Sequence, residues 1–240
     1  MTNYKFDYSQ YKKRINNKTS LPFSIIIFLI IVLMGAICFI CKPSNNVNFY
    51  FLEVNCFFSY SDANICANEI TNLNAGGYVY FNGKYHVLAC AYLNEKDATQ
   101  AKENIKEQYP NAKVFKLSST EFNKNSFKTK ESDAICYAIN ANQKVIEKLF
   151  NLIVELDTNS LTEEQAKREI ETLKNNYISS TDNFNTIFRT NKKLTKQKEK
   201  ISSYVSTLKQ LKHAENISQS LKYCLIKISI LHYSFLEGFC

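Results

Sequence analysis

Cysteine and histidine, the side chains that most often bind metals or act in catalysis, are scattered along this chain. Of its 240 residues, 8 are cysteines and 3 are histidines. The only closely spaced cysteines are Cys38 and Cys41, and neither a histidine nor a second cysteine pair stands near them, as a zinc site would require. We therefore expect no metal and no other cofactor.

The remaining reactive residues also lack a catalytic arrangement. His213 and His232 lie in a helical pattern without a carboxylate or second histidine at ligand spacing, and no glycine-rich loop opens a helix after a strand. Cys56, Cys66 and Cys90 occupy positions of apolar or small character, where cysteine usually packs as a small hydrophobe. Disulfides are the alternative outside the cytoplasm. The sequence predicts a binding protein and not an enzyme.

The central part of the chain has the pattern of a β-hairpin. Two runs rich in aromatic and β-branched residues, 78–81 and 84–92, meet at Asn82-Gly83. Asn-Gly between such runs is a strong hairpin signal, because both residues tolerate a positive φ.

A unit of one strand and one helix occurs twice around this hairpin. When the chain is shifted along itself by 35 residues, Tyr50 falls on Tyr85 and Asp62 falls on Asp97. The expected strands are 49–57, 78–81, 84–92 and 112–117, and the expected helices are 62–73 and 94–109. This order predicts an α+β fold with a ferredoxin-like β-α-β-β-α-β module, also called a split βαβ arrangement.

Alternation along the expected strands separates a core face of the sheet from an open face. The core set is Leu52, Val54, Val87 and Ala89, and the residues between them, Cys90 included, would point the other way. Aromatic faces with hydrogen-bonding groups beside them suit sugars, so the open face is a candidate glycan site. A solvated sheet face and a face covered by the helical bundle are the alternatives. The candidate glycan-binding residues are Phe51, Glu53, Asn55, Tyr80, His86 and Leu88.

Two segments resemble the SPOR domain, the sporulation-related repeat of bacterial envelope proteins. Residues 50–57, with Asp62-Ala63 beyond them, resemble its opening strand and helix start, and residues 85–92 resemble its second half. The likeness covers about 70 of the 240 residues. It includes the internal duplication, the hairpin and both helix starts in order.

The chain departs from the SPOR pattern at four positions. Glu53 and His86 stand where a glutamine and an arginine are usual, and Asn55 and Cys90 stand where glycines are usual. The resemblance implies binding of peptidoglycan, in particular of glycan strands stripped of stem peptides, and recruitment to division or sporulation sites. The alternative is a protein-interaction scaffold of an envelope complex that does not bind glycan.

The first 41 residues have the pattern of a membrane anchor. Residues 1–20 contain five basic side chains and one acidic one, and residues 21–41 are uncharged. At about 1.5 Å per residue the uncharged run spans roughly 30 Å, enough to cross the hydrocarbon core. We expect a single-pass cell-membrane protein with a cytoplasmic basic tail at 1–20, a transmembrane helix at 21–41 and the rest outside. A cleaved signal peptide is the alternative.

The second half of the chain changes from an alternating to a helical period. Residues 131–236 are expected to form an antiparallel bundle of three long helices, with Asn216 as a candidate break in the third. The second helix opens with a capping-box pattern at Thr162 and Gln165. This bundle could hold a protein partner or mediate self-association. The SPOR-like domain before it covers residues 45–120.

The basic net charge of the chain, +8, is not concentrated on the expected binding domain. Residues 45–120 contain six basic and seven acidic side chains, a net charge of −1. A nucleic-acid-binding module should carry its positive charge on the domain that meets the phosphates. We therefore expect no nucleic-acid partner.

Overall fold

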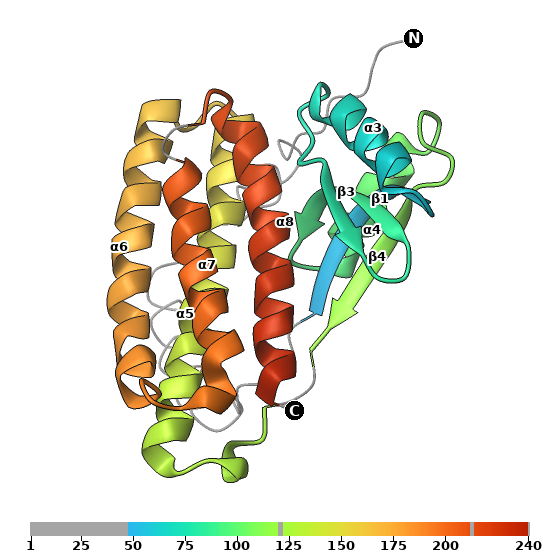
Figure 1. Ribbon diagram of the computed structural model, residues 1–240. Helices are drawn as coiled ribbons and strands as arrows, with labels where there is room; N and C mark the ends of the chain where they lie inside the picture. The colour runs from blue at the N-terminus through green and yellow to red at the C-terminus, as the bar shows by residue number, and fades with distance from the viewer. Residues whose placement is uncertain (1–47, 120–121, 212–213, 240) are drawn as a thin grey trace, which may run out of the picture.

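The computed structural model describes residues 48–119, 122–211 and 214–239. This part of the chain has an α+β fold, in which a four-stranded antiparallel sheet lies beside a helical bundle (Figure 1). No helix within these three ranges is long and apolar enough to cross a membrane. The expected transmembrane helix, residues 21–41, lies outside them.

The first six elements within the described residues follow the order strand, helix, strand, strand, helix, strand. Each begins and ends within a few residues of its expected position. They are β1 (Asn48–Phe57), α3 (Tyr60–Thr71), β2 (Tyr78–Phe81), β3 (Tyr85–Tyr92), α4 (Glu95–Ile105) and β4 (Lys113–Ser118).

Local interactions explain where these elements turn and begin. The backbone N–H of Asn82 donates to the carbonyl of Lys84 at 3.0 Å, and Gly83 has a φ of 76°, which closes the hairpin between β2 and β3. The side chain of Asn94 accepts from the backbone N–H of Asp97 at 2.9 Å, so it satisfies a donor that the first turn of α4 leaves free. The hairpin and this helix start are therefore confirmed.

The sheet is covered on both faces. Its strands lie in the order β2-β3-β1-β4, and each neighbouring pair is antiparallel. Helices α3 and α4 pack on one face, and helix α8 (Ile217–Leu236) of the bundle contacts β3, β2 and β4 on the other (Figure 1). The expectation of an open face is wrong, and the alternative of a face covered by the bundle is the arrangement observed.

An irregularity in the ladder between β1 and β3 changes which side chains share a face. Leu52 pairs with Cys90, Glu53 with Leu88 and Cys56 with His86, so the register shifts by one residue between Leu52 and Glu53 and shifts back between Glu53 and Asn55. Such a shift is a β-bulge. Because partners across a ladder share a face, Cys56 lies on the same face as Glu53, and Asn55 turns to the opposite face.

In the described ranges the bundle contains four long helices where three were expected, because the third is interrupted. The break precedes α8, where the side chain of Asn216 accepts from the backbone N–H of Gln219 at 3.1 Å, so the candidate break is confirmed. The capping box of Thr162 and Gln165 is also present. The other long helices are α5 (Thr129–Asp157), α6 (Glu163–Ile187) and α7 (Thr195–Leu211), and 3-10 helices occupy Lys124–Ser126, Lys192–Leu194 and Glu237–Phe239.

One cluster of buried apolar side chains continues from the sheet into the bundle. The ring of Phe49 in β1 meets the edge of His232 in α8, with 5.8 Å between centroids. Phe51 and Leu88, on the same sheet face, are fully buried. The sheet and the bundle therefore share a core.

Buried charges also hold α8 in place. Lys222, which interrupts the apolar run of α8, is fully buried, and its Nζ lies 2.9 Å from Oδ2 of Asp157 at the end of α5. The hydroxyl of Ser218 donates to the other carboxylate oxygen of Asp157 at 2.8 Å. A buried charge needs such partners, so this pair fixes the start of α8 against the end of α5.

Phe51→Ala tests whether the sheet face is buried. We expect the free energy of unfolding to fall by about 3–5 kcal/mol, because the substitution opens a cavity under α8. The control is Phe81→Ala, since Phe81 is 59% exposed and should change stability by only about 0.5 kcal/mol. Equal and small effects in chemical denaturation would contradict the covered face.

His232 predicts a loss of stability in acid. Burial lowers the pKa of His232 to about 3, whereas an unfolded histidine titrates near ~6.5. Between these values the unfolded chain binds the proton and the folded chain does not. The contribution of His232 to the free energy of unfolding should therefore be fully present above pH ~6.5. It should fall by about 1.4 kcal/mol per pH unit as the pH drops toward 3.

The matched control for this pH dependence is His232→Gln, which can still accept the hydrogen bond that Asn142 Nδ2 makes to His232 Nδ1 at 3.1 Å. Denaturation curves of both proteins from pH 7 to pH 4 should converge as the pH falls, because only the wild type loses the histidine contribution. Parallel curves would show that His232 is not buried in the neutral form.

Candidate functional site

The six residues expected to bind glycan do not form an open surface. Phe51 and Leu88 are fully buried, Glu53 is 1% exposed and His86 is 9% exposed. Tyr80 and Asn55 are half-buried. Because α8 packs on the face that carries most of them, a glycan strand has no platform there while the bundle is docked.

The structure brings five of these six residues to one face of the sheet and separates Asn55 from them. Tyr80 pairs with His86 across the hairpin, and their rings lie 6.4 Å apart; His86 Nδ1 lies 2.9 Å from Glu53 Oε2. Asn55 is on the opposite face because of the bulge. Cys90, also expected on the open face, pairs with Leu52 of the core set.

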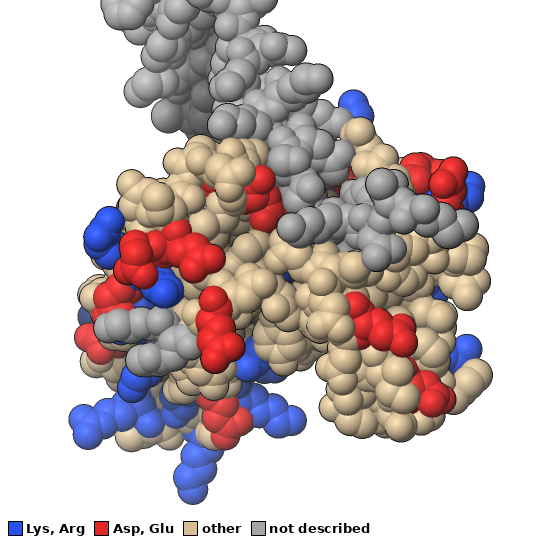
Figure 2. All heavy atoms as spheres, turned by 90° about the horizontal axis from the view of Figure 1, so that it is seen from above, with Lys and Arg blue, Asp and Glu red and all other residues tan. Residues whose placement is uncertain are grey.

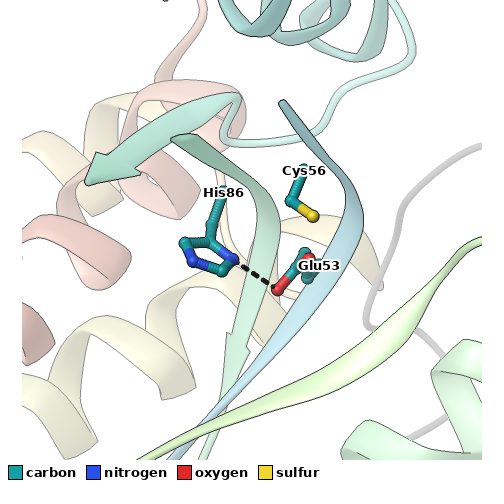
Figure 3. Close-up of side chains that lie close together, drawn as sticks. All are labelled: Glu53, Cys56 and His86. Carbon is teal, nitrogen blue, oxygen red and sulfur yellow. Dashed lines mark hydrogen bonds and ion pairs between the residues drawn. The ribbon is translucent and has the colours of Figure 1, made fainter. Parts of the chain in front are cut away.

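The Glu53–His86 pair, shown in Figure 3, is the buried part of a polar cluster. Nζ of Lys113 in β4 lies 3.2 Å from Glu53 Oε1, and Phe115 packs against the imidazole with 4.7 Å between centroids. Cys56 projects toward the same carboxylate (Figure 3). The sequence did not identify Cys56 or Lys113, because strict alternation places Cys56 on the other face and β4 has no chemical signature.

A cleft of about 610 Å³ lies between the sheet unit and the bundle. One wall consists of α3 and the turn into β2, and the other consists of the end of α7 and the beginning of α8. The described lining residues are Tyr60, Asn64, Asn68, Thr71, Gly76, Gly77, Tyr78, Val79, Thr207, Gln210, Leu211, Ala214, Gln219, Ser220, Tyr223 and Cys224.

The chemistry of this cleft is polar but uncharged. Its described lining contains three tyrosines, four carboxamides and three hydroxyl side chains, and none of these residues carries a formal charge. The rings of Tyr78 and Tyr223 meet across the cleft with 5.2 Å between centroids. Burial raises the pKa of both phenols, so they stay protonated near neutral pH and can donate hydrogen bonds.

Thr207 carries a polar group that the described protein leaves unpaired. The residue is 4% exposed, and its Oγ1 has no hydrogen-bond partner within the described ranges. A buried hydroxyl without a partner costs about 1–3 kcal/mol. Thr207 lines the cleft, but this oxygen is closed to solvent, so a partner from the cleft requires the side chain to turn toward it.

The turn at Gly76-Gly77 allows the two walls to approach each other. A Cβ on Gly76 would lie 2.8 Å from Ile226 Cδ1 and 3.0 Å from the backbone N of Tyr223. Gly77 has a φ of 62°, which favours glycine. This segment leads into β2, and its close contact with α8 is visible only in three dimensions.

The surface seen from above carries both kinds of charge. Figure 2 shows Lys and Arg atoms gathered mainly at one side, with Asp and Glu atoms among them, and uncharged atoms over the middle.

The five cysteines within the described ranges are free thiols.

Comparisons with known proteins do not identify this chain. No protein-family model matches the sequence, and neither characterised proteins nor solved structures provide a significant match. The SPOR resemblance therefore stays a prediction, and the function must be argued from the geometry.

Gly76→Ala tests the close approach between the turn and α8. We expect a loss of about 1–3 kcal/mol in the free energy of unfolding, because the methyl group meets backbone atoms that cannot rotate away. It should also increase the binding of a hydrophobic dye, because the sheet and the bundle separate.

The control is Gly83→Ala, where an added Cβ meets nothing within 4 Å. That variant should lose stability only through its positive φ and should bind no additional dye. Equal dye binding by both variants would contradict the role of Gly76 at the interface.

Proposed function

We propose that this chain is a non-enzymatic, membrane-anchored protein of a bacterial envelope that binds peptidoglycan glycan strands through the cleft between its sheet unit and its bundle. Its role would be to place the protein at division or sporulation sites. The observation that carries the proposal is the cleft of about 610 Å³ lined by tyrosines, carboxamides and hydroxyls.

The lining of the cleft complements the groups that a sugar presents. Sugar rings combine apolar C–H faces with many hydroxyl groups, and N-acetyl groups add an amide. Tyr78 and Tyr223 offer aromatic faces with a polar tip, and carboxamides both donate and accept hydrogen bonds. The hydroxyl of Thr207 is a buried donor and acceptor without a protein partner in the described ranges, and rotation of this side chain toward the cleft would let a sugar hydroxyl satisfy it.

The fold supports a SPOR-like, ferredoxin-like module as the first half of this unit. Strand β3 lies between β1 and β2, as in a split βαβ arrangement. The glycan site differs from the one expected, because α8 covers the sheet face that carries Phe51 and Leu88. Binding is therefore assigned to the edge of the covered sheet, where β2 and α3 meet the bundle.

The membrane placement follows from the amino-terminal pattern. A basic tail at 1–20 and an uncharged run at 21–41 favour one membrane crossing with the tail in the cytoplasm. The sheet unit and the bundle would then lie outside, where the cell wall is within reach.

Two substitutions in the cleft test the proposal. Full-length protein in detergent is titrated with soluble N-acetylglucosamine oligomers and mixed with purified sacculi, with and without amidase treatment. Tyr223→Ala should weaken binding about tenfold, the effect of losing an aromatic anchor worth about 1.4 kcal/mol. Tyr137→Ala is the matched control, since Tyr137 is 64% exposed on α5 and away from the cleft.

Thr207→Val gives a sharper outcome, because stability and affinity should change in opposite directions. Without ligand, removing an unpaired buried hydroxyl should leave the free energy of unfolding unchanged or raise it by up to about 1–3 kcal/mol. Glycan affinity should fall, because the ligand loses a hydrogen bond. Wild-type affinity in both Thr207→Val and Tyr223→Ala would remove the cleft as the site.

A protein-interaction scaffold is the second candidate, and exposed aromatic residues favour it. Phe58 is 83% exposed and Phe81 is 59% exposed, and both lie at the hairpin end of the sheet. Lys84 Nζ lies 4.4 Å from the Phe58 ring centroid. If the unmodified protein binds neither oligomers nor sacculi, this aromatic surface becomes the better candidate for function.

A further inference from the structure

Three potential metal ligands from different parts of the sequence meet on the covered face of the sheet. Glu53 and Cys56 lie on β1 and His86 on β3, and one ligand atom of each lies within 4.8 Å of the other two. Figure 3 shows the three side chains close together, with a dashed line joining the imidazole of His86 to the carboxylate of Glu53. None of these residues lines the glycan cleft.

This set of ligands has the composition of a zinc site. Zinc binds thiolate, imidazole and carboxylate at about 2.0–2.3 Å, and three protein ligands leave a fourth position open. Tetrahedral bonds of that length require ligand atoms roughly 3.3–3.8 Å apart. The observed limit of 4.8 Å therefore needs a movement of about 1 Å, which the half-buried thiol of Cys56 can make by rotation about its χ1 bond.

The surrounding residues hold the other two ligands in position. Glu53 is 1% exposed and His86 is 9% exposed, and the imidazole is packed against Phe115 at 4.7 Å and beside Tyr80. The bulge after Glu53 turns Cys56 onto this face. Two rigid buried ligands and one adjustable ligand form a site that is largely organised before an ion binds.

We propose that Glu53, Cys56 and His86 form a binding site for zinc or another divalent metal ion that prefers thiolate. Binding removes the proton of the Cys56 thiol, which passes to solvent, and the neutral imidazole of His86 binds through the ring nitrogen that carries no proton. The metal replaces the hydrogen bond between His86 and Glu53 with bonds from both residues to one ion.

Lys113 competes with the metal in this site. Its Nζ lies 3.2 Å from Glu53 Oε1, although that oxygen accepts no hydrogen bond of good geometry within the described ranges. The Lys113 side chain is 54% exposed, so its ammonium group can move into solvent when an ion arrives. The lysine keeps the buried carboxylate neutralised without metal, and its removal should strengthen metal binding.

Cobalt titration of the full-length, reduced protein in detergent tests the site. Every sample carries Cys38→Ser and Cys41→Ser, which removes the one closely spaced cysteine pair of the sequence. One equivalent of Co²⁺ should produce the charge-transfer absorption of a thiolate bound to cobalt, and Zn²⁺ should displace it. Cys56→Ser should abolish this absorption, and the control Cys66→Ser should preserve it.

Two further variants separate coordination from a purely structural role. His86→Gln should weaken Co²⁺ binding at least about tenfold, because replacing even a residue that only hydrogen-bonds to a metal ligand typically costs that much affinity. Lys113→Met should strengthen Co²⁺ binding. Thermal unfolding with a chelator present verifies that each variant is folded. The proposal is overturned if the unmodified site gives no thiolate absorption, if the absorption survives Cys56→Ser, or if Lys113→Met weakens binding.

Discussion

The packing of α8 on the sheet is the interaction on which the rest of this structure depends. It buries Phe49, Phe51 and Leu88 on a face that α3 and α4 do not reach. Each fully buried side chain of this size contributes about 1.5–3 kcal/mol, so three of them contribute an amount comparable to the net stability of a whole domain, about 5–15 kcal/mol. The close approach at Gly76 and the buried pair of Lys222 and Asp157 determine where α8 lies. The bundle is therefore part of the same folded unit as the sheet.

The sequence predicted the elements that short-range interactions decide. The hairpin at Asn82-Gly83, the helix start after Asn94 and the break at Asn216 depend on neighbours within a few residues, and all three are found. The covered face was missed because alternation tells which side chains share a face and not what lies above them. Phe51 and Leu88 carried a usable signal: apolar residues on both sides of a strand are typical of a sheet that is buried on both faces.

The candidate sites were harder to predict because they combine distant segments. The cleft joins α3 and the turn before β2 to α7 and α8, so no sequence window contains both walls. Cys56 joins Glu53 and His86 only because a bulge shifts the register by one residue, and a bulge leaves no mark on the pattern of apolar residues. Likewise, Lys222 looked like an interruption of an apolar helix, and it is buried because Asp157 lies 2.9 Å away.

The dependence of the cleft on both halves has a thermodynamic consequence. A ligand that touches Tyr78 on the sheet and Tyr223 on α8 binds only when the bundle is docked. Such a ligand stabilises the docked state by RT ln(1 + [L]/Kd), which is about 2.7 kcal/mol at a concentration of 100 Kd. By the same linkage, a substitution that loosens α8 without touching the cleft lowers the apparent affinity. Ligand binding in the cleft and the integrity of the shared core are therefore coupled, and losing the bundle would remove one wall of the cleft and also uncover the sheet.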